Sequence, residues 1–312
     1  MRATPMESAT STSSVPGGRA DAYPHAADLA LIPFAVEAGR EVAHFELTPD
    51  LTRHDGALYG GTGAAAAVMM METATQRDAV WVATQFVAQA RIGERIDLVA
   101  DVLAEGKRIA QVQVIAKVDD RIIFTALGAT GLPRPGGLTG QYHDMPRVSA
   151  PEQSGALHRR GAMSELVEVG FNRNLEFREA TLETPEPQAM ALWARLTGAG
   201  RAMSAAGVAF VADMVPGAIA RAAGKFGGGF SLDNALRFAA VPETEWVLLH
   251  LRGDVASHGY GHGSFTAWSR EGALLATGSQ TASMTRVFDG EDDPQLDEWR
   301  REIARAVAEG GA

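Results

Sequence analysis

No cysteine occurs among the 312 residues of the chain. Disulfide bonds, thiol nucleophiles and cysteine metal ligands are therefore excluded together. Aromatic residues make up only 7% of the sequence, and basic residues form no block. The 28 basic residues are outnumbered by 38 acidic ones, which gives a formal net charge of −10. Such a chain repels nucleic acid, so we expect no nucleic-acid partner, although a few local cations can still hold a small anion.

Long apolar runs are also missing. No stretch approaches the roughly 20 consecutive apolar residues that a membrane-spanning helix needs, so we expect no membrane span. Residues 1–18 are rich in Ser, Thr, Ala and Gly and lack the apolar core of a secretion signal. We therefore predict a disordered N-terminal segment over residues 1–25 and a cytoplasmic protein.

Apolar residues are nevertheless abundant enough, at 46%, for a substantial core. The length is about twice that of a common domain, which allows two domains or one large one. An apolar, alanine-rich stretch at Gly61–Asp78 has a counterpart at Ser204–Gly224. A helix that is apolar on nearly every side must be buried on every side. We predict one buried helix in each half, with the second kinked or interrupted at Pro216.

Four strand-like segments follow each predicted helix and are separated by turn signals such as Gly93-Glu94. A further strand precedes the first helix at 43–51 and the second near 175–180 or 190–196. Because the strands come in runs rather than alternating with helices, we predict an α+β fold in which a sheet wraps a buried helix in each half. The predicted strands are 80–92, 95–105, 108–117 and 122–132, then 230–240, 246–255, 261–269 and 273–287.

The region between the halves is rich in Pro, Gly, Ser, His and Arg, and a connection of that length indicates a domain boundary. We therefore expect a disordered N-terminus (1–25), a first domain (26–132), a linker (133–172), a second domain (173–290) and a helical C-terminal tail (291–312).

Three motifs, in a fixed order, resemble a known family. Tyr59-Gly60-Gly61 is similar to the Gly-Gly that opens the family's buried helix. Residues 231–238 (Ser-Leu-Asp-Asn-Ala-Leu-Arg-Phe) are similar to its Thr-Ile-Asp-His-Ser-x-Trp-Phe strand, and residues 274–280 to its last strand, which ends in an active-site Gln. Over roughly residues 40–290 the chain resembles the double hot-dog acyl-CoA thioesterases of the TesB type. The resemblance implies two fused hot-dog domains, an acyl-CoA substrate, and no metal or other cofactor.

The same resemblance implies the catalytic residues. The family uses an Asp on the second buried helix, a Thr or Ser on the following strand and a Gln on the last strand. These correspond to Asp213, Ser231 and Gln280. The chain departs from the family pattern at Asn234 and Ala239, where the family has His, at Arg237, where it has an aromatic residue, and at Thr62, where Gln often follows Gly-Gly.

Asp213 lies in an apolar stretch, Val211–Val215. A carboxylate in such a place must be paired, hydrogen-bonded or protonated. In a thioesterase it would orient and deprotonate a water beside the thioester carbon. Ser231 and Gln280 would donate and accept hydrogen bonds there without adding charge. The alternative is an Asp that caps the backbone at the Pro216 kink.

Gly60, Gly61 and Thr62 are the predicted substrate-binding residues. Glycine permits close backbone approach, and the N–H groups at the start of a buried helix can stabilise an oxyanion or contact a phosphate. A simple tight turn into the helix is the alternative.

Several other polar residues could also belong to a functional site. Glu72 lies about one helical turn beyond the position that single hot-dog thioesterases use, and we expect it to face solvent or a salt bridge. We interpret His54-Asp55 as a polar loop pair and Gly227–Gly229 as a flexible turn. His258 and His262 have no third ligand, so we expect no metal site. The chain also lacks the Gly-x-Ser-x-Gly elbow of α/β-hydrolases.

The sequence thus predicts an acyl-CoA thioesterase that releases a carboxylic acid and CoA. Two alternatives stay open: a hot-dog enoyl-thioester hydratase or dehydratase, which needs an acid and a His in one site, and a non-catalytic acyl-CoA-binding protein. The acyl group is open too, as is the choice between CoA and acyl carrier protein. Because hot-dog sheets associate through edges or faces, we expect a homo-oligomer.

Overall fold

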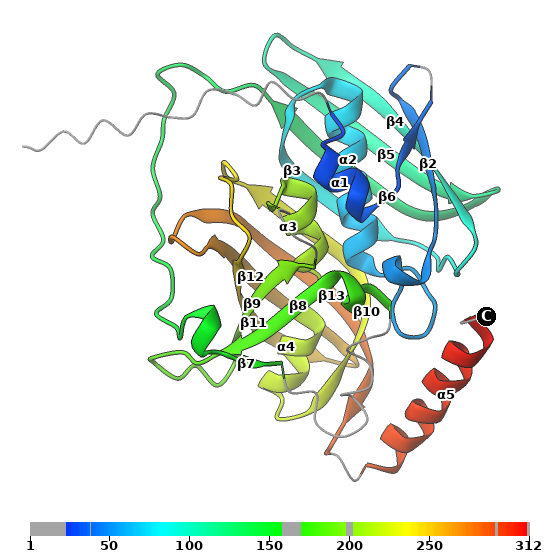
Figure 1. The fold of residues 1–312 in the computed structure, drawn as a ribbon, viewed down its shortest axis with the longest axis vertical. Coiled ribbons are helices and arrows are strands. Elements are labelled where there is room, and N and C mark those ends of the chain that lie inside the picture. Colours follow the sequence, from blue (N-terminus) through cyan, green and yellow to red (C-terminus); the bar gives the residue numbers. More distant parts are fainter. Residues whose placement is uncertain (1–22, 38, 158–169, 198–201, 291–292, 311–312) are drawn as a thin grey trace, which may run out of the picture.

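Figure 1 shows the fold as given by a computed structural model. It describes residues 23–37, 39–157, 170–197, 202–290 and 293–310. Most of the segment predicted to be disordered, residues 1–25, lies outside the described residues, as do parts of the linker and of the C-terminal tail. The described strands form one antiparallel sheet in the order β1-β2-β4-β5-β6-β3-β10-β13-β12-β11-β9-β8-β7.

The first half is built around α2 (Gly60–Thr75), which the apolar stretch predicted. Every residue from Gly61 to Thr73 is buried, and the helix ends where Gln76 turns left-handed at φ 55°. Four strands of this half contact α2: β3 (Asp78–Phe86), β4 (Arg95–Glu105), β5 (Ile109–Val118) and β6 (Arg121–Gly131). Before the helix come α1 (Ala26–Leu31), β1 (Ala35–Val36), β2 (Val42–Glu46) and η1 (Pro49–Leu51).

The second half has two helices where one interrupted helix was expected. These are α3 (Ala205–Val211) and α4 (Val215–Ala222). Pro216 lies in the first turn of α4. Backbone N–H groups in the first turn have no acceptor within the helix, so the lack of one in proline costs no hydrogen bond, and Pro216 helps to begin the helix. The strand before the second helix was predicted near 175–180 or 190–196, and both segments form strands. The strands of this half are β8 (Leu175–Ala180), β9 (Ala189–Leu196), β10 (Phe226–Phe238), β11 (Val247–Ser257), β12 (Tyr260–Ser269) and β13 (Leu274–Phe288).

Gly227–Gly229 was expected to form a flexible turn, and this is wrong, because the three glycines lie inside β10. Close packing against β13 requires glycine at two of the three positions, Gly227 and Gly229. A Cβ at Gly227 would lie 1.9 Å from the Arg286 carbonyl oxygen, and one at Gly229 would lie 2.2 Å from that of Ser283.

The two halves join along a pair of central strands. Residues 81–85 of β3 pair antiparallel with residues 233–237 of β10, so the sheet runs through both halves. Inside the sheet, α2 packs against α3. A Cβ at Gly61 would lie 2.2 Å from the carbonyl oxygen of Phe210, so only glycine allows the helices to approach this closely. The start of α2 consequently meets the junction between α3 and α4.

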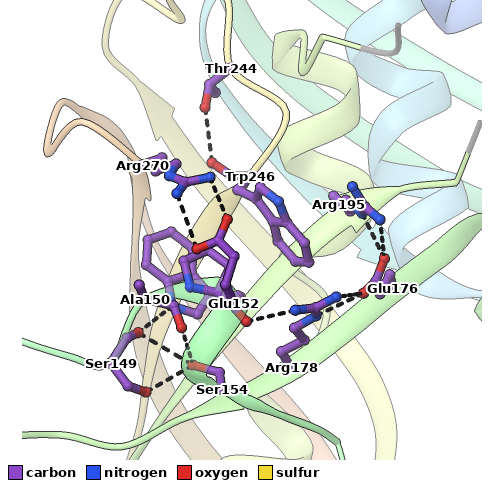
Figure 2. Close-up of polar contacts among 12 residues, drawn as sticks. Ser149, Ala150, Glu152, Ser154, Glu176, Arg178, Arg195, Thr244, Trp246 and Arg270 are labelled. Atoms are coloured by element: carbon purple, nitrogen blue, oxygen red, sulfur yellow. Dashed lines mark hydrogen bonds and ion pairs between the residues drawn. The ribbon is translucent and has the colours of Figure 1, made fainter. Parts of the chain in front are cut away.

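The described first part of the linker runs along the outer edge of the molecule to the second half (Figure 1). It contains η2 (Pro151–Gln153) and β7 (Gly155–Ala156), and η4 (Gly170–Asn174) leads into β8. Figure 2 shows how it is held: Arg178 donates to the Pro151 carbonyl at 2.8 Å, and Glu152 pairs with Arg270 at 2.7 Å. The linker residues Met145 and Val148 pack on a small cluster that includes Trp193, Trp246 and Trp268, separate from the main core.

The C-terminal tail forms the helix α5 (Pro294–Gly310), in line with the prediction. Among the described residues one helical stretch, Ala205–Ala222, has the length and apolarity to cross a membrane, which the sequence had not led us to expect. Of this stretch 72% is buried inside the fold, and buried core helices pass the same test. The stretch is therefore weak evidence for a membrane-spanning helix.

Candidate active site

Asp213 lies in the break between α3 and α4 and is 8% exposed. Its Oδ1 accepts hydrogen bonds from three side chains: Ser231 at 3.1 Å, Asn234 at 3.5 Å, and the amide of Gln280. The Gln280 amide also donates to the Ser231 hydroxyl at 2.7 Å. The structure thus brings Asp213, Ser231 and Gln280 together, from a helix break and two neighbouring strands.

Asn234 is a member of this network that the sequence did not identify. In a regular strand, residues 231 and 234 would point to opposite faces. The pairing of β10 with β13 shifts between Ser231 and Asp233, so Leu232 is an extra residue in a β-bulge. The Asp233 carboxylate accepts the Thr281 backbone N–H at 2.8 Å beside the bulge. The bulge brings both Ser231 and Asn234 onto Asp213.

The start of α2 lies against the Asp213 carboxylate. The backbone N–H of Gly61 donates to Asp213, and a Cβ on Gly60 would lie 2.4 Å from Asp213 Oδ2. These contacts explain why the helix begins with two glycines. Thr62 is placed differently: it is fully buried, its hydroxyl donates to the Leu51 carbonyl at 2.8 Å, and it does not line the cavity described below.

Burial raises the pKa of the Asp213 carboxyl to about 6. Hydrogen bonds from Gln280, Ser231 and the Gly61 backbone, and the positive charge of Arg53, oppose this rise because they stabilise the carboxylate. At neutral pH the group is therefore mostly ionised and can accept a proton. A base with a pKa close to the working pH is well matched to general-base catalysis.

A cavity of about 840 Å³ opens beside Asp213, Gly60 and Ser231. Part of its lining is apolar and comes from both halves and from the linker: Leu58, Tyr59, Phe86, Leu157, Phe171, Met190 and Met214. The rings of Tyr59 and Phe171 stack with their centroids 3.7 Å apart. The sequence gave no signal for Leu157 or Phe171, because only the folded linker brings them to the site.

Another part of the cavity wall carries charge. Arg53 and Arg286 both lie against the ring of Phe230, with guanidinium carbons 4.4 and 5.1 Å from its centroid. His54 lines the same wall, and Asp55 pairs with Arg53 at 2.7 Å. The loop pair His54-Asp55 therefore borders the candidate active site. The hydrogen bonds to the Asp213 side chain come from Ser231, Asn234, Gln280 and Gly61, and not from His54.

Glu72 was expected to face solvent or a salt bridge, and this is wrong. It is 3% exposed, and its Oε1 accepts the backbone N–H of Ala79 at 2.9 Å, just inside β3. Burial raises the pKa of Glu72 well above its ordinary value, which favours the protonated form. Glu72 does not line the cavity. It therefore serves the chain turn after α2 and not the candidate site.

The two glycine-flanked histidines lie apart from the site. His258 bonds the Ser257 hydroxyl in the turn before β12, and His262 on β12 bonds the Thr281 hydroxyl. Within the described ranges, no group of three or more His, Cys, Asp or Glu residues could hold a metal ion.

Two antiparallel units that share one sheet, each around its own buried helix, define a double hot-dog protein. Comparison with solved structures supports this class. A hot-dog protein from Alicyclobacillus acidocaldarius matches with a TM-score of 0.69 at 18% identity, over 84% of this chain and 98% of that one.

The sequence patterns of known families identify the protein further. The acyl-CoA thioesterase N-terminal domain matches residues 47–131, and the acyl-CoA thioesterase C-terminal domain matches residues 145–284. The chain belongs to the TesB-type acyl-CoA thioesterase family, whose members are thioester hydrolases.

Individual structures agree with this assignment. A protein from Novosphingobium aromaticivorans assigned as a thioesterase is 29% identical, with a TM-score of 0.73, over 80% of this chain and 98% of that chain. The tesB protein of Mycobacterium avium subs paratuberculosis is 21% identical, with a TM-score of 0.67, over 81% and 96%. A search of curated proteins gave no match.

Proposed function

We propose that this protein hydrolyses the thioester bond of a fatty acyl-CoA or a related acyl-CoA, with a water activated by Asp213. One observation carries the proposal: Oδ1 of Asp213 is held by three side-chain donors at the wall of a cavity large enough for a substrate, while no described side chain donates to Oδ2. These bonds fix the orientation of the carboxylate and leave Oδ2 without a described side-chain donor, so that a water can bind there.

In the proposed reaction, the water oxygen attacks the thioester carbon while Oδ2 of Asp213 accepts a water proton. The tetrahedral intermediate then collapses, the carbon–sulfur bond breaks, and CoA leaves as a thiolate that takes up the proton held by Asp213, which restores the carboxylate. Ser231, Asn234 and Gln280 do not bond to the substrate in this scheme. They hold Asp213 in place and keep its pKa from rising further.

The negative charge on the carbonyl oxygen would be stabilised at the start of α2. The first residue of a helix has an N–H without a helical partner, and the aligned peptide dipoles place positive charge at that end. Gly60 is the first residue of α2 and lines the cavity. We assign its N–H as the donor to the developing oxyanion.

The test is to incubate the protein with a panel of acyl-CoAs of different chain length and to measure free thiol together with the acyl product by mass spectrometry. We expect equal amounts of CoA and carboxylic acid. A 3-hydroxyacyl-CoA formed from an enoyl-CoA, without thiol, would identify a hydratase instead. Tight acyl-CoA binding without any product would identify a binding protein. Association into a homo-oligomer and a cytoplasmic location stay predictions.

A further inference from the structure

Arg286, near the end of β13, lies in the cavity wall, and its guanidinium makes no hydrogen bond to a described residue. Its side chain is 28% exposed, and its nearest carboxylate is that of Asp55, at 3.6 Å. Asp55 is already held by Arg53, which donates to both of its oxygens at 3.1 and 2.7 Å. The guanidinium of Arg286 therefore keeps its donors available, in a place where burial penalises its charge.

Aromatic rings fix the position of Arg286. Its guanidinium carbon lies 5.1 Å from the ring centroid of Phe230 and 5.9 Å from that of Trp299. Trp299 belongs to α5 and is 7% exposed, packed against Phe288 and edge-on to His54 at 4.8 Å. The helix α5 stands beside the rest of the fold in Figure 1, and Trp299 attaches it to the cavity wall. Both Arg286 and Trp299 lie beyond residue 284, where the family match ends.

The electrostatic surroundings of Arg286 favour an anion. Arg53 and Arg91 add positive charge close to it, whereas Asp55 and Glu302 are the nearby acids. Among the charged groups that act on Arg286, cations outnumber acids when its own charge is included. The net charge of the protein is −10, so this local excess is opposite in sign to the whole molecule.

We propose that Arg286, held by Phe230 and Trp299, binds a phosphate group of the substrate's carrier. The inference rests on the proposed function for the identity of the ligand. A planar guanidinium can donate two parallel hydrogen bonds to a phosphate, and such charged bonds are among the strong ones.

The position of Arg286 suits this role. Ser231 pairs with Ala282 and Gly228 pairs with Arg286 across the two strands, so the arginine is displaced from the catalytic serine by three residues of β10. That is about 10 Å along the strand. The reacting carbonyl and the phosphate lie at opposite ends of a pantetheine arm, so one ligand can occupy both places.

The experiment measures binding of CoA by isothermal titration calorimetry to the wild type and to Arg286→Gln. We expect the variant to bind CoA about 10- to 100-fold more weakly, the range for losing hydrogen bonds to a charged group. The KM for acyl-CoA should rise similarly while kcat is unchanged. Arg286→Lys keeps the charge but loses the paired donors and should recover part of the affinity.

Arg178→Gln is the matched control. Arg178 has the same side-chain exposure, 28%, and also lies over a tryptophan ring, 5.2 Å from the centroid of Trp246 (Figure 2), but it does not line the cavity. The Arg178→Gln substitution removes the same charge, and the affinity of this variant for CoA should lie within about twofold of the wild-type affinity.

Three further ligands decide which phosphate is bound: 3′-dephospho-CoA, 4′-phosphopantetheine and pantetheine. The loss in Arg286→Gln should disappear when the relevant phosphate is absent and should never be seen with pantetheine. An Arg286→Gln variant that binds CoA as the wild type does, an equal loss with pantetheine, or a wild type that does not bind CoA would overturn the inference. Binding is measured without turnover, so failure of the proposed hydrolysis in an Asp213 variant is a separate result.

Discussion

Replacing Asp213 by Asn should stabilise the folded protein at neutral and alkaline pH. Burial raises the pKa of this carboxyl from 3.8 to about 6, because the folded state disfavours the charged form. A group with a raised pKa contributes stability that is fully present below its ordinary pKa and is lost as pH rises through the folded value. Above pH 6 the wild type therefore carries a destabilising ionised group, which Asn removes.

The size of the effect follows from the two pKa values. The difference between the two pKa values corresponds to a decrease of at most about 3 kcal/mol in the free energy of unfolding as pH rises from 3.8 to above 6. Asn can keep its Oδ1 as the acceptor for Ser231, Asn234 and Gln280, but these bonds are weaker to a neutral amide than to a carboxylate, which reduces the gain. The Oε1 atom of Gln280 is buried without a partner, so a flip of this amide can offer the new Asn an acceptor.

Thermal unfolding of both proteins between pH 4 and pH 8 is the assay. The variant should melt higher at pH 8, by up to about 5 °C for a protein of this size. The difference should shrink as pH falls through 6 and be smallest near pH 4. A variant that is less stable than the wild type throughout this range would refute the reasoning, because the carboxylate would then be fully compensated in the folded state.

Three further substitutions test other parts of the account. Ser231→Ala removes a hydrogen bond that stabilises the Asp213 carboxylate, so kcat should fall about 10- to 100-fold and the acid limb of the pH–rate profile should move to higher pH; an unmoved limb would contradict this. Gly61→Ala forces a Cβ to within 2.2 Å of the Phe210 carbonyl oxygen, and denaturant unfolding should show a loss of about 1–3 kcal/mol or more; unchanged stability would contradict the close helix contact. Glu72→Gln keeps a buried acceptor without the ionisation, so turnover should be unchanged and stability equal or higher at pH 8; lost turnover would place Glu72 in the mechanism.

The strand pattern could be predicted because it depends on local sequence. Turn signals and apolar runs marked most strands of both halves to within a few residues, for example Arg95–Glu105, whereas the strand predicted over 80–92 ends at Phe86. The burial of α2 could be predicted from its composition alone, because no face of that helix is polar enough to meet water. Asp213, Ser231 and Gln280 came from the family resemblance, and the structure brings all three together.

Features that depend on tertiary contacts could not be predicted. The bulge at Leu232 turns Asn234 toward Asp213, and nothing in the local pattern marks an extra residue there. Gly227–Gly229 has the composition of a turn, yet it pairs with β13 as part of a strand, and the neighbouring backbone passes too close for a side chain at Gly227 and Gly229. Glutamate is usually found at the surface, yet the chain turn after α2 buries Glu72 against the backbone N–H of Ala79.

The charged wall of the cavity was missed for a similar reason. Arg53, Arg286 and Trp299 come from three separate regions of the chain, and their rings and guanidinium groups meet only in the folded protein. A linker that supplies Phe171 to the same cavity adds a further contact that spacing in the sequence cannot reveal.

The rate of acyl-CoA hydrolysis by Asp213→Asn, compared with the wild type between pH 5 and pH 8, tests the central claim most directly. The wild type should lose activity as pH falls below about 6, where the base becomes protonated. The variant should be folded and about 10²- to 10⁴-fold slower at pH 8, the usual contribution of a general base, with no acid limb of its own. A folded variant that hydrolyses acyl-CoA within tenfold of the wild-type rate would contradict the assignment of Asp213 as the base.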